Sequence, residues 1–131
     1  MRALYLDSSA FVKVIVEEPA SIALREYLAA ESARFVSSAL LRTEAQRAVR
    51  QQGPEVRGAV RAGLRRIELI AIDDRILDAA GTLEPQILRT LDAIHVASAL
   101  AVGDDLVAIV TYDGRMIDAA GQLGLPTATP V

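Results

Sequence analysis

Short apolar segments alternate with helical segments along the whole chain, and this alternation limits the folds that the chain can adopt. The helical segments have apolar residues at helical spacing with polar residues between them. Strands that alternate with helices predict an α/β sandwich with a mostly parallel sheet. The expected strands are residues 3–6, 34–37, 67–72, 106–111 and 125–128, and the expected helices are residues 10–16, 20–30, 39–52, 55–66, 74–80, 90–100 and 115–123.

Capping and turn residues mark the ends of several helices. Ser37 or Ser38 is expected to cap the helix at residues 39–52, and Asp73 or Asp74 the helix that ends near residue 80. Gly53-Pro54 separates two helical segments. With 131 residues and no internal repeat, the chain is expected to form a single domain over residues 1–131.

Composition excludes several classes of function. The chain has no cysteine, which rules out disulfides and thiolate chemistry. No apolar run approaches the roughly 18 residues needed to cross a bilayer. Asp7 and Lys13 interrupt the apolar start, so we expect no signal peptide and a soluble cytoplasmic protein.

Residues 90–100, T-L-D-A-I-H-V-A-S-A-L, are apolar on almost every side of a helix, which is typical of a buried helix. Asp92 and His95 lie three residues apart and therefore project from the same face. A buried carboxylate must be paired, hydrogen-bonded or bound to a metal. Alternatively, Thr90 is the N-cap and Asp92 simply favours the positive end of the helix dipole, while His95 is a core residue with satisfied hydrogen bonds.

Three further acidic residues stand out by position. Glu44 falls within the apolar arc of its expected helix, beside Leu40, Leu41, Ala45 and Ala48. An unpaired glutamate is rare at such a position. The alternative to a functional role is an internal ion pair with an arginine. Asp7 and Asp113 each follow a strand, where the crevice of an open α/β sheet lies. Aspartate is also common there simply as a turn or cap residue.

Together, Asp7, Glu44, Asp92 and Asp113 predict a site for a hard cation. If they converge, their repulsion raises some of their pKa values unless a cation neutralises them. Carboxylate oxygens without thiolate select Mg²⁺ or Mn²⁺. Such an ion activates water and stabilises charge on a phosphodiester, so metal-dependent phosphodiester hydrolysis is the expected chemistry.

Four sequence blocks carry a resemblance to a known family. They are L-Y-L-D-S-S-A-F at residues 4–11, L-L-R-T-E at residues 40–44, L-D-A-I-H-V-A-S-A at residues 91–99 and T-Y-D-G-R-M at residues 111–116. In this order and spacing the chain is similar to PIN-domain proteins, and more narrowly to VapC-type toxin ribonucleases of bacterial toxin–antitoxin pairs. The resemblance covers essentially the whole chain.

The resemblance implies a three-layer α/β/α fold in which Asp7, Glu44, Asp92 and Asp113 bind Mg²⁺ or Mn²⁺. Hydroxyls near the metal would come from Ser8 or Ser9 and from Thr111. The implied activity is cleavage of single-stranded segments of structured RNA, such as tRNA or ribosomal RNA, leaving 3′-hydroxyl and 5′-phosphate ends. The implied partners are a cognate antitoxin and a second copy in a homodimer.

Two positions near the implied site remain open in the sequence. Asp118 is a second acidic candidate, but it lies a turn beyond the strand end, so Asp113 is preferred. His95 matches a frequent family position, and we interpret it as a packing or hydrogen-bonding residue because a hard cation does not need imidazole.

An arginine-rich stretch lies between residues 42 and 66, with arginines at 42, 47, 50, 57, 61, 65 and 66. Arginine suits bidentate contacts with phosphate or carboxylate, so this stretch is compatible with binding nucleic acid or an acidic partner. The family resemblance implies that it flanks the pocket and holds phosphates. It is equally compatible with the solvated face of two helices. With only three tyrosines and two phenylalanines, shape and phosphate contacts are favoured over base stacking.

Other functions fit the sequence less well. A haloacid-dehalogenase-like phosphatase needs a second aspartate two residues after the first, where this chain has Ser9. A receiver domain needs a late lysine, and the only lysine is Lys13. A catalytically silent module that binds RNA or an antitoxin is also possible, and a divalent-metal requirement would distinguish it from an enzyme.

Overall fold

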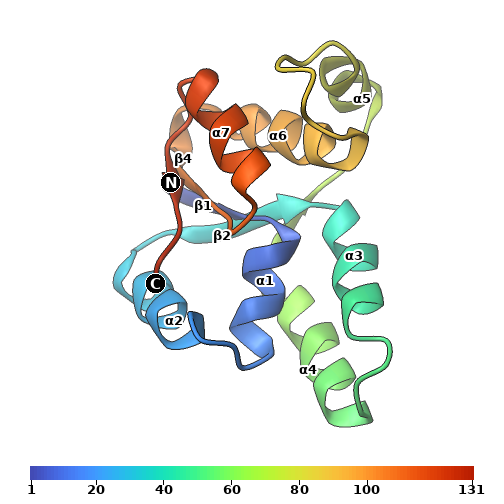
Figure 1. Cartoon of the computed structure of the whole chain (residues 1–131), viewed down its shortest axis with the longest axis vertical. Coiled ribbons are helices and arrows are strands. Elements are labelled where there is room, and N and C mark those ends of the chain that lie inside the picture. The colour runs from blue at the N-terminus through green and yellow to red at the C-terminus, as the bar shows by residue number, and fades with distance from the viewer.

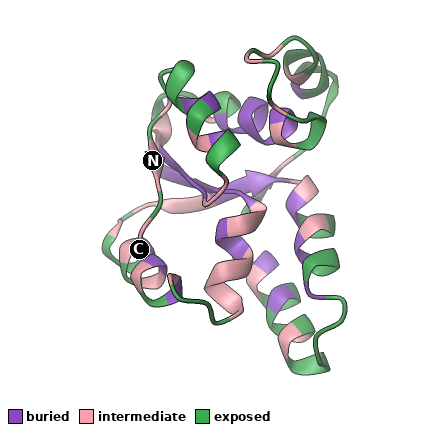
Figure 2. Cartoon of the chain, in the orientation of Figure 1, coloured by how far each residue is buried: buried purple, intermediate pink, exposed green.

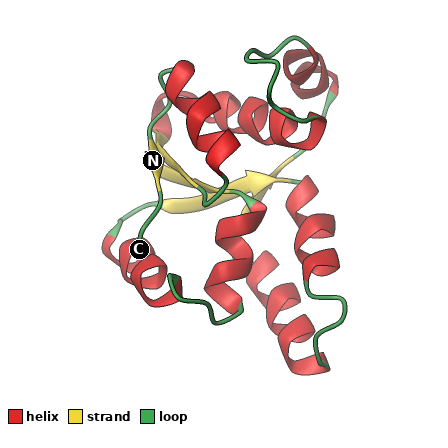
Figure 3. Cartoon of the chain, viewed as in Figure 1, coloured by secondary structure: helices red, strands yellow, loops and turns green.

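A five-stranded sheet with the order β3-β2-β1-β4-β5 forms the centre of the computed structural model, which describes residues 1–131. All four strand pairings are parallel. Figure 3 shows the sheet between two groups of helices, so the expected three-layer α/β/α sandwich with a parallel sheet is confirmed. The strands are β1 Ala3–Leu6, β2 Arg34–Ser38, β3 Glu68–Ile70, β4 Leu106–Val110 and β5 Thr127–Ala128.

Helices cover both faces of the sheet (Figure 1). One face carries α1 Ser8–Ile15, α2 Ser21–Ala30, α3 Leu40–Ala48 and α4 Pro54–Leu64. The other face carries α5 Asp74–Gly81, α6 Thr90–Val102 and α7 Gly114–Gln122, with a short 3-10 turn, η1 Gly103–Asp105, between α6 and β4. No helix is both long and apolar enough to cross a membrane.

The central strand β1 contributes to the core on both sides, because its side chains alternate between the two faces. Ala3 and Tyr5 pack in a cluster with residues of α6 and α7. Leu4 and Leu6 pack in a second cluster with residues of α1 and α2. This position buries every residue of β1 (Figure 2).

Helix α6 is buried without interruption from Ala93 to Ala99, as its apolar composition predicted. Its end positions Leu91 and Leu100 are exposed instead. The expected cap at Thr90 is wrong: Arg89 occupies the N-cap position with extended backbone, and Thr90 is already helical. Asp92 nevertheless lies in the first turn, where the helix dipole favours its charge.

Helix α3 ends earlier than its periodicity suggested, at Ala48 rather than residue 52. Leu41 and Ala45 are buried, whereas Ala48 is exposed and not part of the core. The buried Val49, at the C-cap, turns into the core in its place.

The capping predictions hold in part. The Ser38 hydroxyl accepts a hydrogen bond from the Leu40 amide at 3.1 Å, although Ala39 has the N-cap position. Asp73 caps α5 by accepting from the Ile76 amide at 3.0 Å.

The order of the strands determines where a site can form. Strands β1 and β4 are neighbours, and the chain leaves them toward opposite edges of the sheet. In open α/β sheets, ligands bind in the crevice beyond the carboxyl ends of the strands at such a reversal. Asp7 directly follows β1, and Thr111 to Asp113 follow β4, so both lie at this crevice.

Candidate active site

Asp7 lies at the junction of β1 and α1 and uses both of its carboxylate oxygens. Oδ1 accepts hydrogen bonds from the Ala10 amide at 3.0 Å and the Ser9 hydroxyl at 2.7 Å. Oδ2 accepts from the Thr111 hydroxyl at 2.5 Å. The side chain thereby caps α1 and also joins the end of β1 to the end of β4.

The loop after β4 is fastened to this junction by the same hydroxyls. The Tyr112 amide donates to the Ser9 hydroxyl at 3.0 Å, and the Asp113 amide donates to the Thr111 hydroxyl at 3.1 Å. Asp113 itself is the N-cap of α7 and accepts from the Arg115 amide at 3.0 Å. The loop therefore holds Asp113 beside the crevice.

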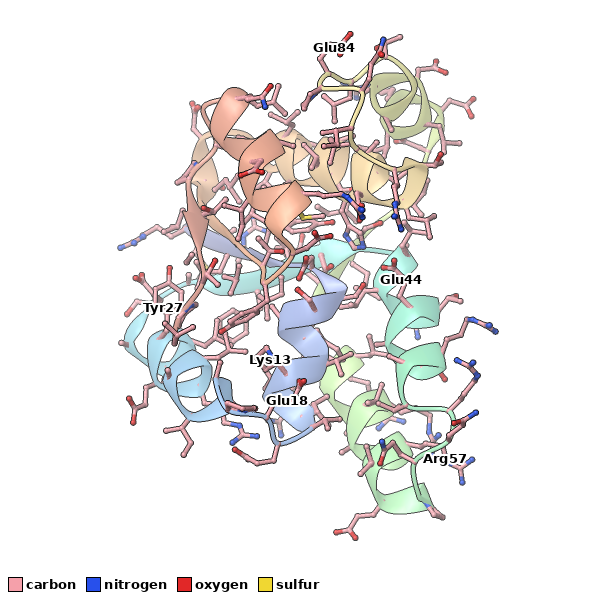
Figure 4. The ribbon with its side chains drawn as sticks, in the orientation of Figure 1. Lys13, Glu18, Tyr27, Glu44, Arg57 and Glu84 are labelled. Atoms are coloured by element: carbon pink, nitrogen blue, oxygen red, sulfur yellow. The ribbon has the colours of Figure 1, made fainter.

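Glu44 projects from α3 toward the start of α1 and toward α6 (Figure 4). Its Oε1 accepts from the Ser8 hydroxyl at 2.5 Å and pairs with His95 Nε2 at 2.6 Å. The partner of this inward glutamate is thus an imidazole, and not the arginine of the alternative interpretation. His95 also contacts the Tyr5 hydroxyl through Nδ1 at 2.7 Å, which confirms it as a hydrogen-bonding residue.

The acidic side chains surround one cavity of about 480 Å³. Its lining is mostly polar and consists of Glu44, Arg89, Thr90, Leu91, Asp92, Asp113 and Arg115. Three of the four predicted acids therefore lie around a single pocket, whereas Asp7 is buried beside them and does not line it. The exposed Asp118 does not line it either. A cavity of about 500 Å³ beside α5 and α6 is slightly larger, but seven of its nine lining residues are hydrophobic.

Burial and mutual repulsion shift the pKa values of these acids. Burial raises the pKa of Asp92, and the negative charge of Asp113 raises it further, with smaller contributions from Asp7 and Glu44. Burial also raises the pKa of Asp7, although hydrogen bonds from Ser9 and Thr111 oppose the shift. For Glu44, burial is outweighed by hydrogen bonds from His95 and Ser8, so its pKa is lowered. The pKa values of Asp7 and Asp92 are therefore raised in the metal-free protein, and a bound cation would lower them by stabilising the charged carboxylates.

The donor chemistry of the pocket fits a hard cation, because its anionic groups are all carboxylates and hydroxyls lie beside them. As the side chains lie, no three His, Asp or Glu residues are close enough together to hold an ion. A cation here would therefore require Asp92 or Asp113 to move closer to Glu44. The pocket has ligand types that suit a hard cation, but its carboxylates are not already assembled around one position.

The arginines of the pocket are not the ones that the sequence singled out. None of the seven arginines between residues 42 and 66 lines it, and Arg57 lies at the opposite end of the α3–α4 pair from Glu44 (Figure 4). The pocket instead contains Arg89 and Arg115, which form no ion pair with its carboxylates. Their sequence positions offered a signal, since Arg89 precedes Asp92 by three residues and Arg115 follows Asp113 by two.

Comparisons with known proteins agree with this architecture. The family model described as "PIN domain" matches residues 4–122. The chain is 52% identical to Ribonuclease VapC46 of Mycobacterium tuberculosis (strain ATCC 25618 / H37Rv) over 130 residues, covering 99% of each chain. It is 40% identical to Ribonuclease VapC35 of the same strain over 130 residues, covering 97% of this chain and 96% of the relative.

Solved structures show the same fold at low sequence identity. The Mycobacterium tuberculosis VapC20 structure, whose description reads "Sarcin-Ricin loop cleaving toxin", superposes with a TM-score of 0.76 at 14% identity, covering 97% of this chain and 99% of VapC20. A toxin-antitoxin complex from Klebsiella pneumoniae superposes with a TM-score of 0.75 at 20% identity and 98% coverage of each chain. From the family match, the relatives and the shared fold, we conclude that this chain belongs to the PIN-domain family, among the VapC-type ribonucleases.

Proposed function

We propose that this protein is a divalent-metal-dependent endoribonuclease and the toxin of a toxin–antitoxin pair. The observation that carries the proposal is the arrangement of Glu44, Asp92 and Asp113 around one pocket, with Asp7 beside them at the reversal of the sheet order. The relatives at 52% and 40% identity are named ribonucleases, which supports the same activity here.

In this proposal Asp7, Glu44, Asp92 and Asp113 hold Mg²⁺ or Mn²⁺. When bound, the ion would supply an activated water and neutralise charge on the phosphodiester. The hydroxyls of Ser8, Ser9 and Thr111 orient the carboxylates, since each donates to Glu44 or Asp7.

Arg89 and Arg115 are the residues best placed to bind the phosphate of the substrate. They line the same pocket as the carboxylates and have no ion-pair partner there. A guanidinium binds two phosphate oxygens at once, which would orient the scissile bond beside the carboxylates. The products would be a 3′-hydroxyl and a 5′-phosphate.

The proposed substrate is a single-stranded segment of a structured RNA, such as tRNA or ribosomal RNA. All seven arginines between residues 42 and 66 are exposed and form no ion pair, so they are available to phosphates outside the pocket. The chain has three tyrosines and two phenylalanines, and few side chains are therefore available for base stacking. Recognition through RNA shape and backbone is the mode that fits this surface.

Two apolar surfaces support the proposed protein partners. The first is a groove of about 370 Å³ lined by eleven residues, nine of them hydrophobic, from α1, α2, β1, β2, α4 and the residues after α4. This groove would accept an apolar helical segment of a cognate antitoxin in the cytoplasm. Leu77, Ile87 and Leu91 are exposed near α5 and the start of α6, and they would pack in a homodimer. Ala62→Glu in the groove and Ile87→Glu on the second surface, a residue that does not line the acidic pocket, would separate antitoxin binding from dimerisation.

The test is cleavage of total RNA by the purified protein with Mg²⁺ or Mn²⁺ and with EDTA, alongside the Asp7→Asn variant. The expected result is cutting at discrete positions that requires the metal and is lost in the variant. Equal cutting by both proteins would defeat the proposal.

One observation favours a second candidate, a catalytically silent module that binds RNA or an antitoxin: no three possible metal ligands are already assembled. Such a module would bind its partner without any metal-dependent cleavage.

A further inference from the structure

A chain of two hydrogen bonds, one buried and one part-buried, connects the centre of the sheet to the acidic pocket. The Tyr5 hydroxyl lies 2.7 Å from His95 Nδ1, and His95 Nε2 lies 2.6 Å from Glu44 Oε1. Tyr5 is 0% exposed and His95 is 2% exposed, so water does not compete for the contact between them. The two rings meet edge to face, with an interplanar angle of 84° and centroids 5.9 Å apart.

The chemistry of the two outer groups determines which atom of the imidazole carries the proton. The Glu44 carboxylate is an acceptor, so Nε2 donates to it across the 2.6 Å contact. Burial raises the pKa of the Tyr5 hydroxyl, although the nearby hydroxyls of Ser37 and Ser98 oppose the shift, so Tyr5 keeps its proton and can donate. With the imidazole proton on Nε2, Nδ1 accepts from Tyr5 and Nε2 donates to Glu44, so this tautomer satisfies both contacts.

We propose that Tyr5 and His95 are positioning residues that hold Glu44 in the orientation needed to bind the catalytic cation, an inference that rests on the proposed function. His95 and Ser8 both bond to Oε1, whereas Oε2 makes no hydrogen bond with the protein. Glu44 lines the pocket, so Oε2 is the oxygen left for a cation. Tyr5 acts one step further away, by fixing the tautomer of His95.

The packing around Tyr5 suits it to this task. It lies on β1, the central strand, in a cluster with Val36, Val96, Ile109 and Met116, all at most 1% exposed. A side chain held this tightly cannot adopt another position at low cost. Residues that orient a metal ligand typically change metal affinity or activity about 10–100-fold when they are removed.

The experiment uses the fact that His95 is the only histidine in the chain. Its ¹⁵N imidazole signals are therefore unambiguous, and they report which ring nitrogen carries the proton. Tyr5→Phe removes only the hydroxyl, and Tyr27→Phe on α2 is the matched control. The Kd for Mn²⁺ is measured for each protein by calorimetry, beside RNA cleavage, and thermal unfolding verifies that each variant is folded.

In the wild type we expect a proton on Nε2, the nitrogen that faces Glu44. Tyr5→Phe is expected to change this pattern and to raise the Kd for Mn²⁺ about 10-fold or more, with a similar loss of cleavage. Tyr27→Phe is expected to match the wild type. His95→Ala is expected to weaken Mn²⁺ binding, and His95→Gln to restore part of it, because its amide can still donate to Glu44.

The measurements distinguish a failure of the positioning role from a failure of the metal-dependent function. If the wild type binds Mn²⁺ and Tyr5→Phe leaves both the tautomer and the Kd unchanged, the positioning role is overturned while the nuclease proposal stands. If the wild type binds no Mn²⁺ even though the expected tautomer is present, the metal-dependent function itself fails, and the positioning role fails with it.

Discussion

Asp7 Oδ2 accepts a hydrogen bond from the Thr111 hydroxyl at 2.5 Å, although the two residues are 104 positions apart in the chain. This contact joins the carboxyl ends of β1 and β4, the two strands at which the order of the sheet reverses. The Thr111 hydroxyl also accepts from the Asp113 amide. One buried hydroxyl thus binds both the Asp7 carboxylate and the backbone of Asp113.

Thr111→Val, which keeps the shape of the side chain, is expected to destabilise the protein by about 1–3 kcal/mol, because it leaves buried polar groups of Asp7 and Asp113 without a partner. Cleavage should fall as well, since the loop that holds Asp113 loses its attachment. Urea unfolding measures the first effect. Thr82→Val, at an exposed hydroxyl with a long 3.5 Å contact, is the control and should change stability by less than about 0.5 kcal/mol.

Asp7→Asn is expected to stabilise the metal-free protein at neutral pH. The folded-state pKa of Asp7 is raised above the ordinary 3.8, so the folded protein binds this proton more tightly than the unfolded chain. Stability from Asp7 is therefore greatest below pH 3.8 and is lost as the pH rises through the folded-state pKa. Asparagine does not titrate and avoids this loss, with an expected gain of about 0.5–2 kcal/mol.

The measurement for Asp7→Asn is the free energy of unfolding in EDTA as a function of pH. The difference between variant and wild type should be present at pH 7 and should shrink under acid conditions. A variant that is less stable than the wild type at every pH would contradict the prediction, because the lost hydrogen bonds would then outweigh the buried charge.

Mg²⁺ or Mn²⁺ is expected to stabilise the wild type, because it binds the folded state and relieves the repulsion among Asp7, Asp92 and Asp113. At 100 times the Kd the gain is about 2.7 kcal/mol. Thermal unfolding with increasing metal concentration tests this, with Asp92→Asn as the variant expected to lose most of the shift. Asp118→Asn, outside the pocket, should retain the full shift.

Arg89→Gln and Arg115→Gln are each expected to weaken RNA binding and to reduce the slope of log K against log salt by about 1, if each guanidinium binds one phosphate. Fluorescence anisotropy with a single-stranded RNA in EDTA measures binding without cleavage. Arg2→Gln is the control, because Arg2 is paired with Glu31 at 3.0 Å away from the pocket. Equal salt slopes for all four proteins would remove both arginines from the phosphate contacts.

Much of the site followed from local patterns in the chain. Apolar runs locate the strands, and Asp7 and Asp113 stand out because Asp7 directly follows one strand and Asp113 lies shortly after another. Helical periodicity placed Glu44 inward, and the structure finds it pointing to His95. These patterns succeed because the period of a helix or strand and the shared edge of parallel strand ends depend on residues that are close in sequence.

Other features could not be read from local patterns. Thr90 was expected as a cap, but Arg89 has that position, and α3 ends at Ala48 because Val49 turns into the core. Helix ends of this kind depend on small free-energy differences among neighbouring residues, and packing against the rest of the molecule easily changes the outcome.

The sequence by itself determined the layered fold, the approximate positions of the strands and the candidate acids, because these depend on short-range periodicity and on residue chemistry. Only the tertiary structure decided that His95 joins Tyr5 to Glu44, that Asp7 lies beside the pocket and not in its lining, and that Arg89 and Arg115 complete it. The Tyr5–His95 contact alone joins residues 90 positions apart. Their geometry depends on the order of the strands and on how the helices pack over them, which no local pattern contains.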